Sequence, residues 1–550
     1  MANGVEGDSR VQKAAWSMAA AGWEVTLLGR APGAERLEYR LGPARVLLLP
    51  VGAAVSGYER GRGAPLRQAR VRRAAYARAR AVVARWDALD GAPGARRRRL
   101  AARLRGLLAA HPALDLLLVP LGAGRVGGPL RLAWDGLRGA VDRYGGWRSL
   151  NPWFRDLELA FAPVIAELDP DLIHAHDFHT VGIGARAAAR RSTPGRPVRW
   201  LYDAHEYLAG IEVPRRRDVR ARLRRRMLLG VEREYIGRAD AVVTVSEAIA
   251  GRLHADHALP VRPRVVLNAP LVPAGAPDGP DVRRVVGLPP QVPLLLYSGG
   301  LAARRGVATV VRALPALPGV HLVLVAREGD ADAAGLAALA ERLGVADRLH
   351  LAGYVSPDQV VRYIASATAG LVPILHRPNH ELSLITKYLE YLHAGLPILC
   401  SDVAEMARAT RALAVGEVFR AGDVPDFARS ARLLLAHPER YRRTYQPGGA
   451  AAEALPGLSW SGQAAALDAL YAELTGHRPQ PGPVEPQSGP VEPQSGPVEP
   501  RSGPVDSRSG PVEPRPGPLR LRPVAAAEPG DPGRPRAASG PPGNVPTVQG

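Results

Sequence analysis

Short apolar segments alternate with helical segments along this chain, and the series occurs twice. This alternation constrains the fold more than any other feature, because strands that alternate with helices build a parallel sheet covered by helices. Strands are predicted at residues 23–28, 45–50, 172–174, 198–202, 241–245, 265–267, 294–297, 321–325 and 349–351. Helices are predicted at residues 11–21, 153–168, 306–314, 333–343 and 384–394. The sequence therefore predicts an α/β protein with two doubly wound domains.

Changes in composition mark the boundaries between the parts of the chain. A link rich in Pro, Gly and Asp at 270–281 ends the first series. We predict a first domain at 1–270 with an Arg-rich helical insertion at about 60–150, a second domain at 271–457, a C-terminal helix at 458–476 and a tail at 477–550. In the tail, Ser-Gly-Pro-Val-Glu-Pro recurs with a seven-residue period. Proline at this density prevents helices and sheet ladders, so the Pro-rich tail is predicted to be disordered and without a catalytic role.

The size and charge of the chain exclude several classes of protein. With 550 residues, 46% of them hydrophobic, the chain is long enough for two cores. Its net charge is +20, and arginines cluster at 67–85, 96–105 and 215–226. Such clusters attract anionic membrane faces or nucleic acids. They lack the interleaved aromatic residues of base-stacking surfaces, so specific nucleic-acid binding is not expected, whereas peripheral membrane association stays open.

The single cysteine and the first ten residues indicate the compartment. Cys400 ends an apolar run, where a small buried hydrophobe is expected rather than a nucleophile, and one cysteine forms no disulfide framework. Residues 1–10 are polar, and no stretch approaches the ~18 apolar residues of a membrane span. We therefore expect a cytoplasmic protein that is neither secreted nor integral to a membrane, with peripheral contact to the inner membrane face left open.

The chain begins unusually close to its first predicted helix. A doubly wound domain normally opens with a buried central strand, yet only seven residues, polar and rich in glycine, precede Asp8. We expect either a start upstream of Met1 or a gap in the first sheet.

Lysine is rare in this Arg-rich chain, and one of its two lysines, Lys387, lies at the start of a predicted helix. Ser383 is the predicted N-cap, and Gly395 and Pro397 end the helix. Helix N-termini favour anions, and the compact ammonium of Lys387 suits a phosphate. Glu390 lies on the same face and is expected to bind sugar hydroxyls. A simple ion pair between Lys387 and Glu390 is the alternative.

A second candidate phosphate site follows the first predicted strand of the second domain. Gly299 and Gly300 form a turn there, and Arg304 and Arg305 precede the next helix. Glycine lets the backbone approach an anion closely, and a guanidinium neutralises its charge. Glycine turns after strands are common, so the prediction depends on the lysine-bearing helix of the same domain.

Seven motifs between residues 8 and 475 occur in an order and spacing that resemble a known family. They lie at 8–11, 171–177, 202–206, 239–247, 299–306, 353–355 and 387–397. In these motifs the chain resembles the glycosyltransferases of family 4, which have the GT-B fold of two Rossmann-like domains that face a cleft. The resemblance implies transfer of a sugar from a nucleoside diphosphate sugar to a glycan, lipid or small-molecule acceptor. It also implies retention at the anomeric carbon, no cofactor and no essential metal.

The resemblance further implies roles for single residues. Arg305 and Lys387 would bind the donor diphosphate, Glu390 the ribose hydroxyls, and the loop at Gly353 the base. His205 would lie beside the transferred sugar as a catalytic residue. A solvated loop histidine is the alternative interpretation of His205.

Two positions depart from the family pattern. The family commonly has Arg where Gly300 stands, so one diphosphate contact is missing or comes from Arg304. The family also commonly has two glutamates with seven residues between them, whereas eight residues separate Glu381 from Glu390. Glu381 is the candidate catalytic carboxylate near the sugar.

Several residues near the predicted strand at 172–174 suggest a metal site. Alternate residues of a strand share a face, so His174 and His176 can converge, with Asp177 and His179 nearby. The sequence offers no later set of His and Asp residues that completes such a site. We therefore expect a loop that lines the cleft, and no metal.

The function predicted from the sequence is that of a retaining glycosyltransferase. Two alternatives stay open. A nucleotide-sugar epimerase is another kind of GT-B enzyme, and a binding or scaffold protein with a decayed site would account for Gly300.

Overall fold

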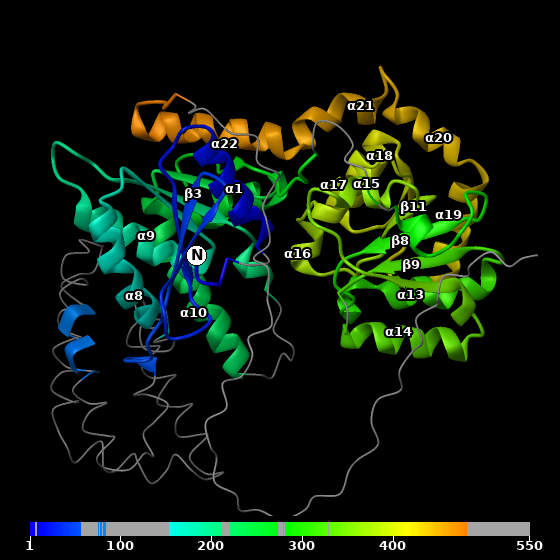
Figure 1. Cartoon of the computed structure of the whole chain (residues 1–550), viewed down its shortest axis with the longest axis horizontal. Helices are drawn as coiled ribbons and strands as arrows, with labels where there is room; N and C mark the ends of the chain where they lie inside the picture. Colours follow the sequence, from blue (N-terminus) through cyan, green and yellow to red (C-terminus); the bar gives the residue numbers. More distant parts are fainter. Residues whose placement is uncertain are drawn as a thin grey trace, which may run out of the picture. The chain divides into compact units, whose positions relative to one another are not determined.

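The computed structural model describes residues 1–5, 8–56, 75, 77–79, 81–83, 153–211, 219–272, 279, 281–327 and 329–480, all within one compact unit, Met1–Val491 (Figure 1). The expected Arg-rich insertion at about 60–150 and the tail at 477–550 lie almost wholly outside the described residues. The strands are β1 (Thr26–Arg30), β2 (Leu37–Leu41), β3 (Ala44–Leu49), β4 (Leu172–His176), β5 (Arg199–Ala204), β6 (Ala241–Thr244), β7 (Arg264–Val265), β8 (Leu294–Ser298), β9 (His321–Val325), β10 (Leu349–Ala352), β11 (Ala369–Val372), β12 (Ile398–Ser401) and β13 (Gly416–Phe419). The α-helices are α1 (Ser9–Ala20), α8 (Trp153–Leu168), α9 (Phe178–Arg191), α10 (Val219–Tyr235), α11 (Glu247–His257), α12 (Val282–Val285), α13 (Val307–Ala313), α14 (Ala331–Arg342), α15 (Val360–Ile364), α16 (Pro378–Glu381), α17 (Thr386–His393), α18 (Ala404–Leu413), α19 (Val424–Ala436), α20 (Pro438–Arg442), α21 (Ala450–Ala454) and α22 (Trp460–Thr475).

The second half of the chain forms one parallel sheet of six strands in the order β10-β9-β8-β11-β12-β13. The chain enters the middle of the sheet with β8, adds two strands on one side, and then adds three on the other. The strand order therefore reverses between β8 and β11. In open sheets of this kind, ligands bind beyond the carboxyl ends of the strands at the point of reversal.

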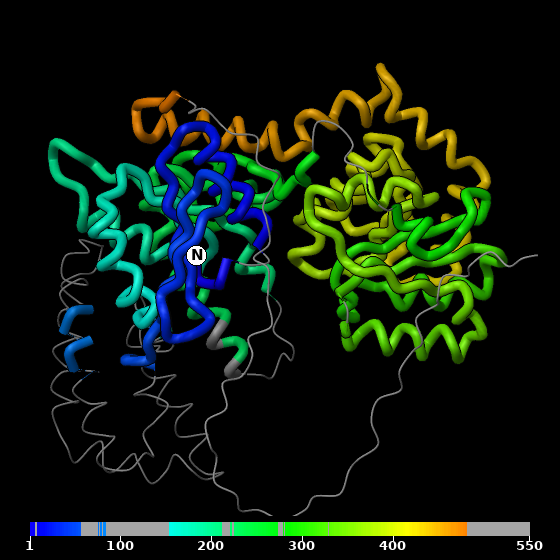
Figure 2. The backbone as a smooth tube through the Cα atoms, in the orientation of Figure 1, coloured from blue at the N-terminus to red at the C-terminus, as the bar shows by residue number. Residues whose placement is uncertain are grey.

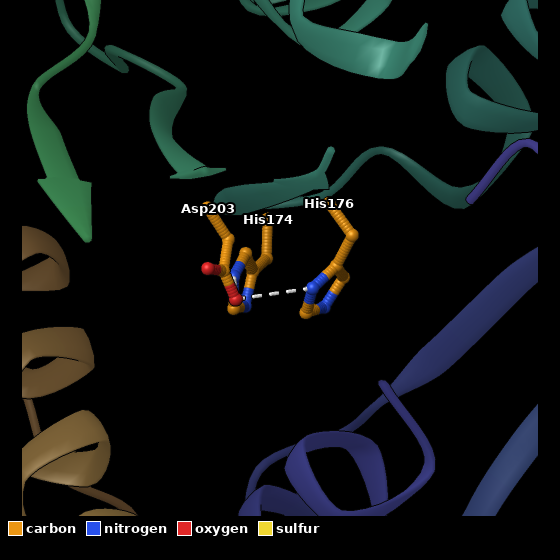
Figure 3. Close-up of side chains that lie close together, drawn as sticks. All are labelled: His174, His176 and Asp203. Atoms are coloured by element: carbon orange, nitrogen blue, oxygen red, sulfur yellow. Dashed lines mark ion pairs between the residues drawn. The ribbon is translucent and has the colours of Figure 1, made fainter. Parts of the chain in front are cut away.

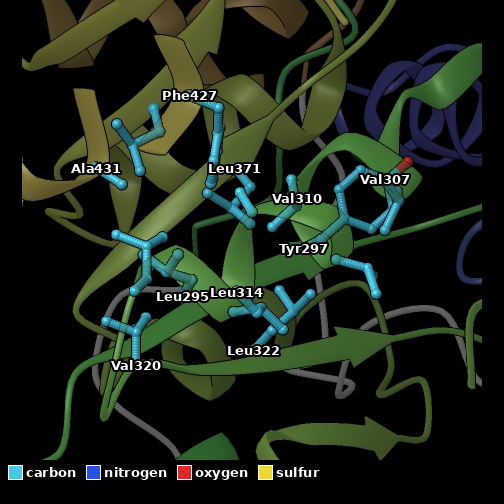
Figure 4. Packing of buried hydrophobic residues seen from close by; sticks show 14 of the residues in the cluster. Leu295, Tyr297, Val307, Val310, Leu314, Val320, Leu322, Leu371, Phe427 and Ala431 are labelled. Carbon is cyan, nitrogen blue, oxygen red and sulfur yellow. The ribbon is translucent and has the colours of Figure 1, made fainter. Parts of the chain in front are cut away.

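Helices cover both faces of this sheet (Figure 1). One apolar cluster joins Leu295 and Leu322 to α13, α14 and α19, where Phe427 packs (Figure 4). A second cluster joins Leu294 and Leu296 to α15, α17 and α18. Because neighbouring residues of a strand point to opposite faces, β8 is buried at all five positions. This doubly wound arrangement is the one that the sequence predicts.

The first half of the chain forms two smaller sheets among the described residues, in the orders β1-β3-β2 and β4-β5-β6-β7. Only the pairing of β2 with β3 is antiparallel. Among the described residues no strand pairs with both β1 and β4, so a gap, one of the two possibilities expected, separates these edge strands. The helix α22 packs on α1 and β4, and its Trp460 and Leu467 share an apolar cluster with Met18 and Leu201.

Most predicted elements are present, and the differences are local. The predicted helix at 153–168 and strand at 321–325 match α8 and β9. The predicted cap of α17 is wrong: α17 begins at Thr386, its N-cap Ile385 makes no side-chain bond, and Ser383 Oγ donates to Asn379 O at 2.6 Å. The strands β2, β11, β12 and β13 were not predicted, because they are short and show no long apolar alternation.

The structure shows the surroundings of Cys400 and the character of the helices. Cys400 is fully buried in β12 and forms no disulfide, as expected. Among the residues that the structure describes, no helix has the length and apolar character needed to cross a membrane.

Candidate active site

The loop after β8 lies at the point where the strand order reverses. Its backbone requires glycine at two positions, since Gly299 has φ of +110° and Gly306 has φ of +72°. A Cβ atom on Gly306 would also lie 1.8 Å from the carbonyl oxygen of Pro373, directly after β11. Leu375 N donates a hydrogen bond of 3.1 Å to Arg304 O. The loop is thus held beside both β8 and β11, where a ligand is expected.

Lys387, on α17, contacts this loop. Its Nζ lies 3.7 Å from the centroid of the Tyr297 ring, and a Cβ atom on Gly299 would lie 2.9 Å from Nζ. Burial lowers the pKa of Lys387 well below its ordinary value, and Arg305 lowers it further. Glu390 opposes this shift, but within the described part of the chain it forms no ion pair with Lys387. The ion-pair alternative is therefore not realised among the described residues, and Lys387 Nζ instead lies over the Tyr297 ring.

The other lysine of the chain, Lys13, has a structural role. Its Nζ donates to Asn268 Oδ1 at 2.9 Å and to Ala269 O at 2.5 Å, and it lies 4.7 Å from the centroid of the Trp460 ring. Burial lowers the pKa of Lys13 to about 7. Lys13 therefore ties α1 to the segment after β7 and to the start of α22, whereas Lys387 has no such backbone partners among the described residues.

The remaining predicted donor residues lie at the same edge of the sheet. Arg305 is half-buried and Arg304 is exposed. Gly300 is exposed, and its carbonyl oxygen accepts a hydrogen bond of 2.7 Å from the Tyr297 hydroxyl. Gly353 is exposed and follows β10, two strands from β8. The roles assigned to these residues in donor binding stay predictions.

Glu381 lies in a different set of contacts from the one expected. Its Oε1 lies 2.6 Å from His376 Nδ1, and its Oε2 accepts a hydrogen bond of 2.8 Å from Ala404 N at the start of α18. His376 Nε2 lies 3.0 Å from Asp402 Oδ1. The bond to Glu381 raises the pKa of His376. The structure therefore gives both oxygens of Glu381 partners in its own half of the chain.

His205 follows β5 and belongs to a buried, charged network. Its Nε2 lies 3.6 Å from Asp203 Oδ2 and 3.3 Å from His176 Nδ1. Arg10 donates two hydrogen bonds of 2.9 Å to Asp203, and both side chains are almost inaccessible to solvent. Burial lowers the pKa of His205, but the Asp203 carboxylate outweighs burial, so this pKa lies above its ordinary value. Burial raises the pKa of Asp203, but Arg10 and the neighbouring histidines together outweigh burial and hold this pKa well below the usual range.

Three side chains of this network point toward a common centre (Figure 3). His174 Nε2 and His176 Nδ1 lie 3.4 Å and 3.2 Å from Asp203 Oδ2, a geometry that could hold a metal ion. The expectation that no later residue completes the set is wrong, because Asp203 pairs with His176 in register on β5. Arg10 already occupies both oxygens of Asp203, and its positive charge opposes a metal cation there. We interpret the cluster as the support of His205.

Asp177 and His179 form a contact that the sequence alone did not predict. Asp177 has φ of +64°, its side chain accepts a hydrogen bond of 2.7 Å from Phe178 N, and Oδ2 lies 3.0 Å from His179 Nδ1. A non-glycine residue with this backbone conformation is strained, and such strain collects at functional sites. An acidic residue between a strand and a helix, with His two positions later, was the available signal.

Both halves of the chain match models of glycosyltransferase families. Residues 292–437 match a family described as Glycosyl transferases group 1. Residues 99–270 match the family described as Glycosyltransferase Family 4.

Curated relatives carry one recurrent description. The chain is 26% identical over 250 residues to the D-inositol 3-phosphate glycosyltransferase of Mycobacterium marinum, covering 44% of this chain and 52% of that protein. It is 28% identical over 246 residues to the enzyme of the same name from Xylanimonas cellulosilytica, covering 44% and 56%. The chain therefore spans about half the length of these relatives.

Solved structures resemble almost the whole described fold. Sucrose-phosphate synthase from Thermosynechococcus elongatus shares 18% identity with a TM-score of 0.55, covering 85% of this chain and 93% of that chain. The α,α-trehalose 6-phosphate synthase from Burkholderia multivorans shares 15% identity with a TM-score of 0.50, covering 86% and 97%. At these identities the likeness concerns the fold alone.

Proposed function

Because the chain belongs to the glycosyltransferases of family 4 and has the GT-B fold, we propose that it transfers a sugar from a nucleoside diphosphate sugar to an acceptor hydroxyl. One observation supports the donor site most strongly. The positive-φ loop at Gly299 and the side chain of Lys387, which forms no ion pair with the described residues, meet where the strand order reverses between β8 and β11. Backbone free of side chains, next to a positive charge at this position, is what a diphosphate requires.

The charges of the site suit a leaving diphosphate. In the proposed reaction the bond between the anomeric carbon and the diphosphate oxygen breaks, and a bond from the same carbon to the acceptor oxygen forms on the same face. The acceptor proton passes to the departing diphosphate. Lys387 and Arg305 stabilise the negative charge that grows on the diphosphate, so no metal is needed for this purpose. Glu390 binds the ribose hydroxyls, and the loop at Gly353 binds the base.

His205 is the proposed catalytic residue of the first half of the chain. Asp203 raises its pKa, so His205 carries a proton more readily than an ordinary histidine and can donate a hydrogen bond to the sugar. Arg10 keeps Asp203 ionised, and His176 restrains the ring of His205 at 3.3 Å. Glu381 is a weaker candidate than His205 for a catalytic residue, because His376 and the α18 backbone already occupy its oxygens.

The acceptor is proposed from the relatives alone. Both of the relatives described above are named for D-inositol 3-phosphate, so this compound is the first acceptor to test, ahead of glycans and lipids. A cytoplasmic location, with peripheral membrane contact through the Arg-rich segments, stays a prediction.

A two-stage assay tests the proposed function. Thermal shift with a panel of uridine, guanosine and adenosine diphosphate sugars identifies the donor through the stabilisation that it gives. Release of nucleoside diphosphate is then measured with and without D-inositol 3-phosphate. Release that requires an acceptor supports transfer, interconversion of the donor sugar without an acceptor indicates an epimerase, and the absence of any nucleotide binding indicates a decayed binding protein.

A further inference from the structure

The last described helix of the chain, α22, follows the six-stranded sheet in sequence but packs on the first half of the chain. In Figure 2 the orange tube of α22 lies beside the blue tube of α1, and α22 also contacts β4. Trp460 Nε1 donates a hydrogen bond of 2.9 Å to Ser17 Oγ. Trp23 Nε1 donates one of 2.8 Å to Asp468 Oδ1. Polar contacts thus fix α22 to the first half at two places.

Tyr471 of α22 contacts the histidine network. Its hydroxyl lies 2.7 Å from Nδ1 of His174 on β4, and the two rings meet edge to face with their centroids 5.8 Å apart. Trp23 packs edge to face on the same tyrosine ring, at a centroid distance of 5.6 Å. Burial raises the pKa of Tyr471, so its hydroxyl keeps its proton at neutral pH.

The direction of this hydrogen bond follows from the other nitrogen of His174. Burial lowers the pKa of His174, so its imidazole is neutral and carries one proton. Nε2 lies 3.4 Å from Oδ2 of Asp203, whose carboxylate is ionised, and a nitrogen lone pair at this distance would be repelled. The proton is therefore on Nε2, and Nδ1 accepts the hydrogen bond from Tyr471.

Tyr471 is also what holds the His174 ring. Nε2 of His174 lies at an ion-pair distance from Asp203 but forms no hydrogen bond with the described residues. Within that part of the chain, the hydroxyl of Tyr471 therefore makes the one hydrogen bond of the His174 side chain. Loss of this hydroxyl would leave a buried acceptor without a donor and release the ring.

His176 connects His174 to His205. The rings of His174 and His176, both drawn in Figure 3, stack with centroids 3.8 Å apart and planes 26° apart. Nδ1 of His176 forms a hydrogen bond of 3.3 Å with Nε2 of His205. Because interiors are closely packed, a rotation of the His174 ring would displace the His176 ring and its bond to His205.

The alternative is that Tyr471 serves to anchor α22 and nothing else. That helix has other anchors, since Trp460, Leu467 and Leu470 are buried in an apolar cluster with α1 and β5 residues. The Trp23 bond to Asp468 adds a polar anchor. The hydroxyl of Tyr471 is thus not needed to dock the helix, and its partner lies in the network that supports His205.

We propose that Tyr471 is a positioning residue: its hydroxyl fixes the ring of His174 and, through His176, holds His205 in place for the sugar. This inference rests on the proposed function, in which His205 donates a hydrogen bond to the transferred sugar. It gives α22 a part in the reaction, because the helix that follows the donor half in sequence completes the support of a catalytic residue in the first half.

Tyr471→Phe in the full chain tests this proposal, with Tyr445→Phe as the matched control. Tyr445 lies in the second half and donates a hydrogen bond of 2.8 Å to Leu396 O, so both changes remove one hydroxyl and one hydrogen bond. NMR of protein labelled with ¹⁵N-histidine follows the ring nitrogens of the 14 histidines, assigned through single substitutions. The parent is expected to show the His174 proton on Nε2. The His174, His176 and His205 signals should shift in Tyr471→Phe and stay in place in Tyr445→Phe.

Kinetics supply the second measurement. Tyr471→Phe is expected to lower kcat about tenfold with the donor Kd nearly unchanged, because a displaced His205 affects the reacting sugar rather than the nucleotide. The control should turn over at the parent rate.

Three results would overturn the proposal. The first is unchanged His205 signals in Tyr471→Phe, and the second is an equal shift of these signals in Tyr445→Phe. The third is a parent-like kcat of Tyr471→Phe in a protein that His205→Gln slows. Normal turnover of His205→Gln would instead refute the catalytic role of His205, and the NMR signals would still decide whether Tyr471 fixes its ring.

Discussion

Replacement of Lys387 by Met is expected to stabilise the free protein while it weakens nucleotide binding. Burial and Arg305 lower the pKa of Lys387, so at neutral pH the folded protein holds this proton less tightly than the unfolded chain, where lysine has a pKa near ~10.4. The penalty is greatest at low pH, where both states are protonated, and it disappears as the pH rises through the unfolded pKa. Met carries no charge, so Lys387→Met should raise the unfolding midpoint near pH 7.

The effect on binding is expected to have the opposite sign. A charge-assisted hydrogen bond to a diphosphate contributes about 1.5–3 kcal/mol, which corresponds to roughly tenfold to a hundredfold in Kd. Lys387→Met should therefore weaken nucleoside diphosphate binding at least about tenfold. Lys387→Arg should restore binding only in part, since Tyr297 and the Gly299 backbone leave little room for the wider guanidinium.

Calorimetry also tests the protonation of Lys387. A bound diphosphate should raise its pKa, so binding takes up a proton and affinity falls as the pH rises through the pKa of the free protein. Titrations in two buffers with different ionisation enthalpies measure this uptake, which should vanish in Lys387→Met. Unchanged nucleoside diphosphate affinity in Lys387→Met would refute the assignment of this helix to the donor.

Three further substitutions are expected to have distinct effects. Gly299 has φ of +110°, so Gly299→Ala should lower the free energy of unfolding by about 1–3 kcal/mol and weaken nucleotide binding. Gly300 has open space around it, so Gly300→Ala, the control, should change neither quantity in thermal and binding assays. Arg10→Met leaves Asp203 buried without its partner and should cost about 3–5 kcal/mol in chemical denaturation. Arg10 depresses the pKa of Asp203, so the parent keeps the stabilisation from the Arg10–Asp203 pair above pH ~3.9 and loses it as the pH falls through the folded pKa of Asp203. Equal loss of stability of parent and variant in acid would contradict this. His205→Gln should lower turnover about a hundredfold with donor Kd nearly unchanged, and a normal rate in a folded variant would remove His205 from the catalytic set.

The doubly wound fold was predictable because its strands are long apolar runs between helical patterns. The strand β8, with Leu294 to Tyr297 all apolar, is recognisable from sequence alone. The strand β11 was not, because four residues that include Gly370 carry no clear period. Gly370 has a packing reason, since a Cβ there would lie 2.5 Å from the Tyr391 ring. Packing of this kind depends on tertiary contacts that no local pattern contains.

The glycine-containing loop after β8 was predictable, and the histidine network was not. Glycines and arginines after β8 form one short motif, so their spacing is visible in the sequence. Arg10 and Asp203 are 193 positions apart, and only the fold brings them within 2.9 Å. Glu381 was assigned from a spacing that resembles a family pattern, but this spacing did not reveal its partners His376 and Ala404.

The most direct test of the account is a crystal structure of the protein with the nucleoside diphosphate that thermal shift selects. The account predicts the diphosphate at the carboxyl edge of β8 and β11, with a phosphate oxygen about 3 Å from Lys387 Nζ and next to the backbone at Gly299. A diphosphate bound elsewhere, with Lys387 still packed on Tyr297, would contradict it.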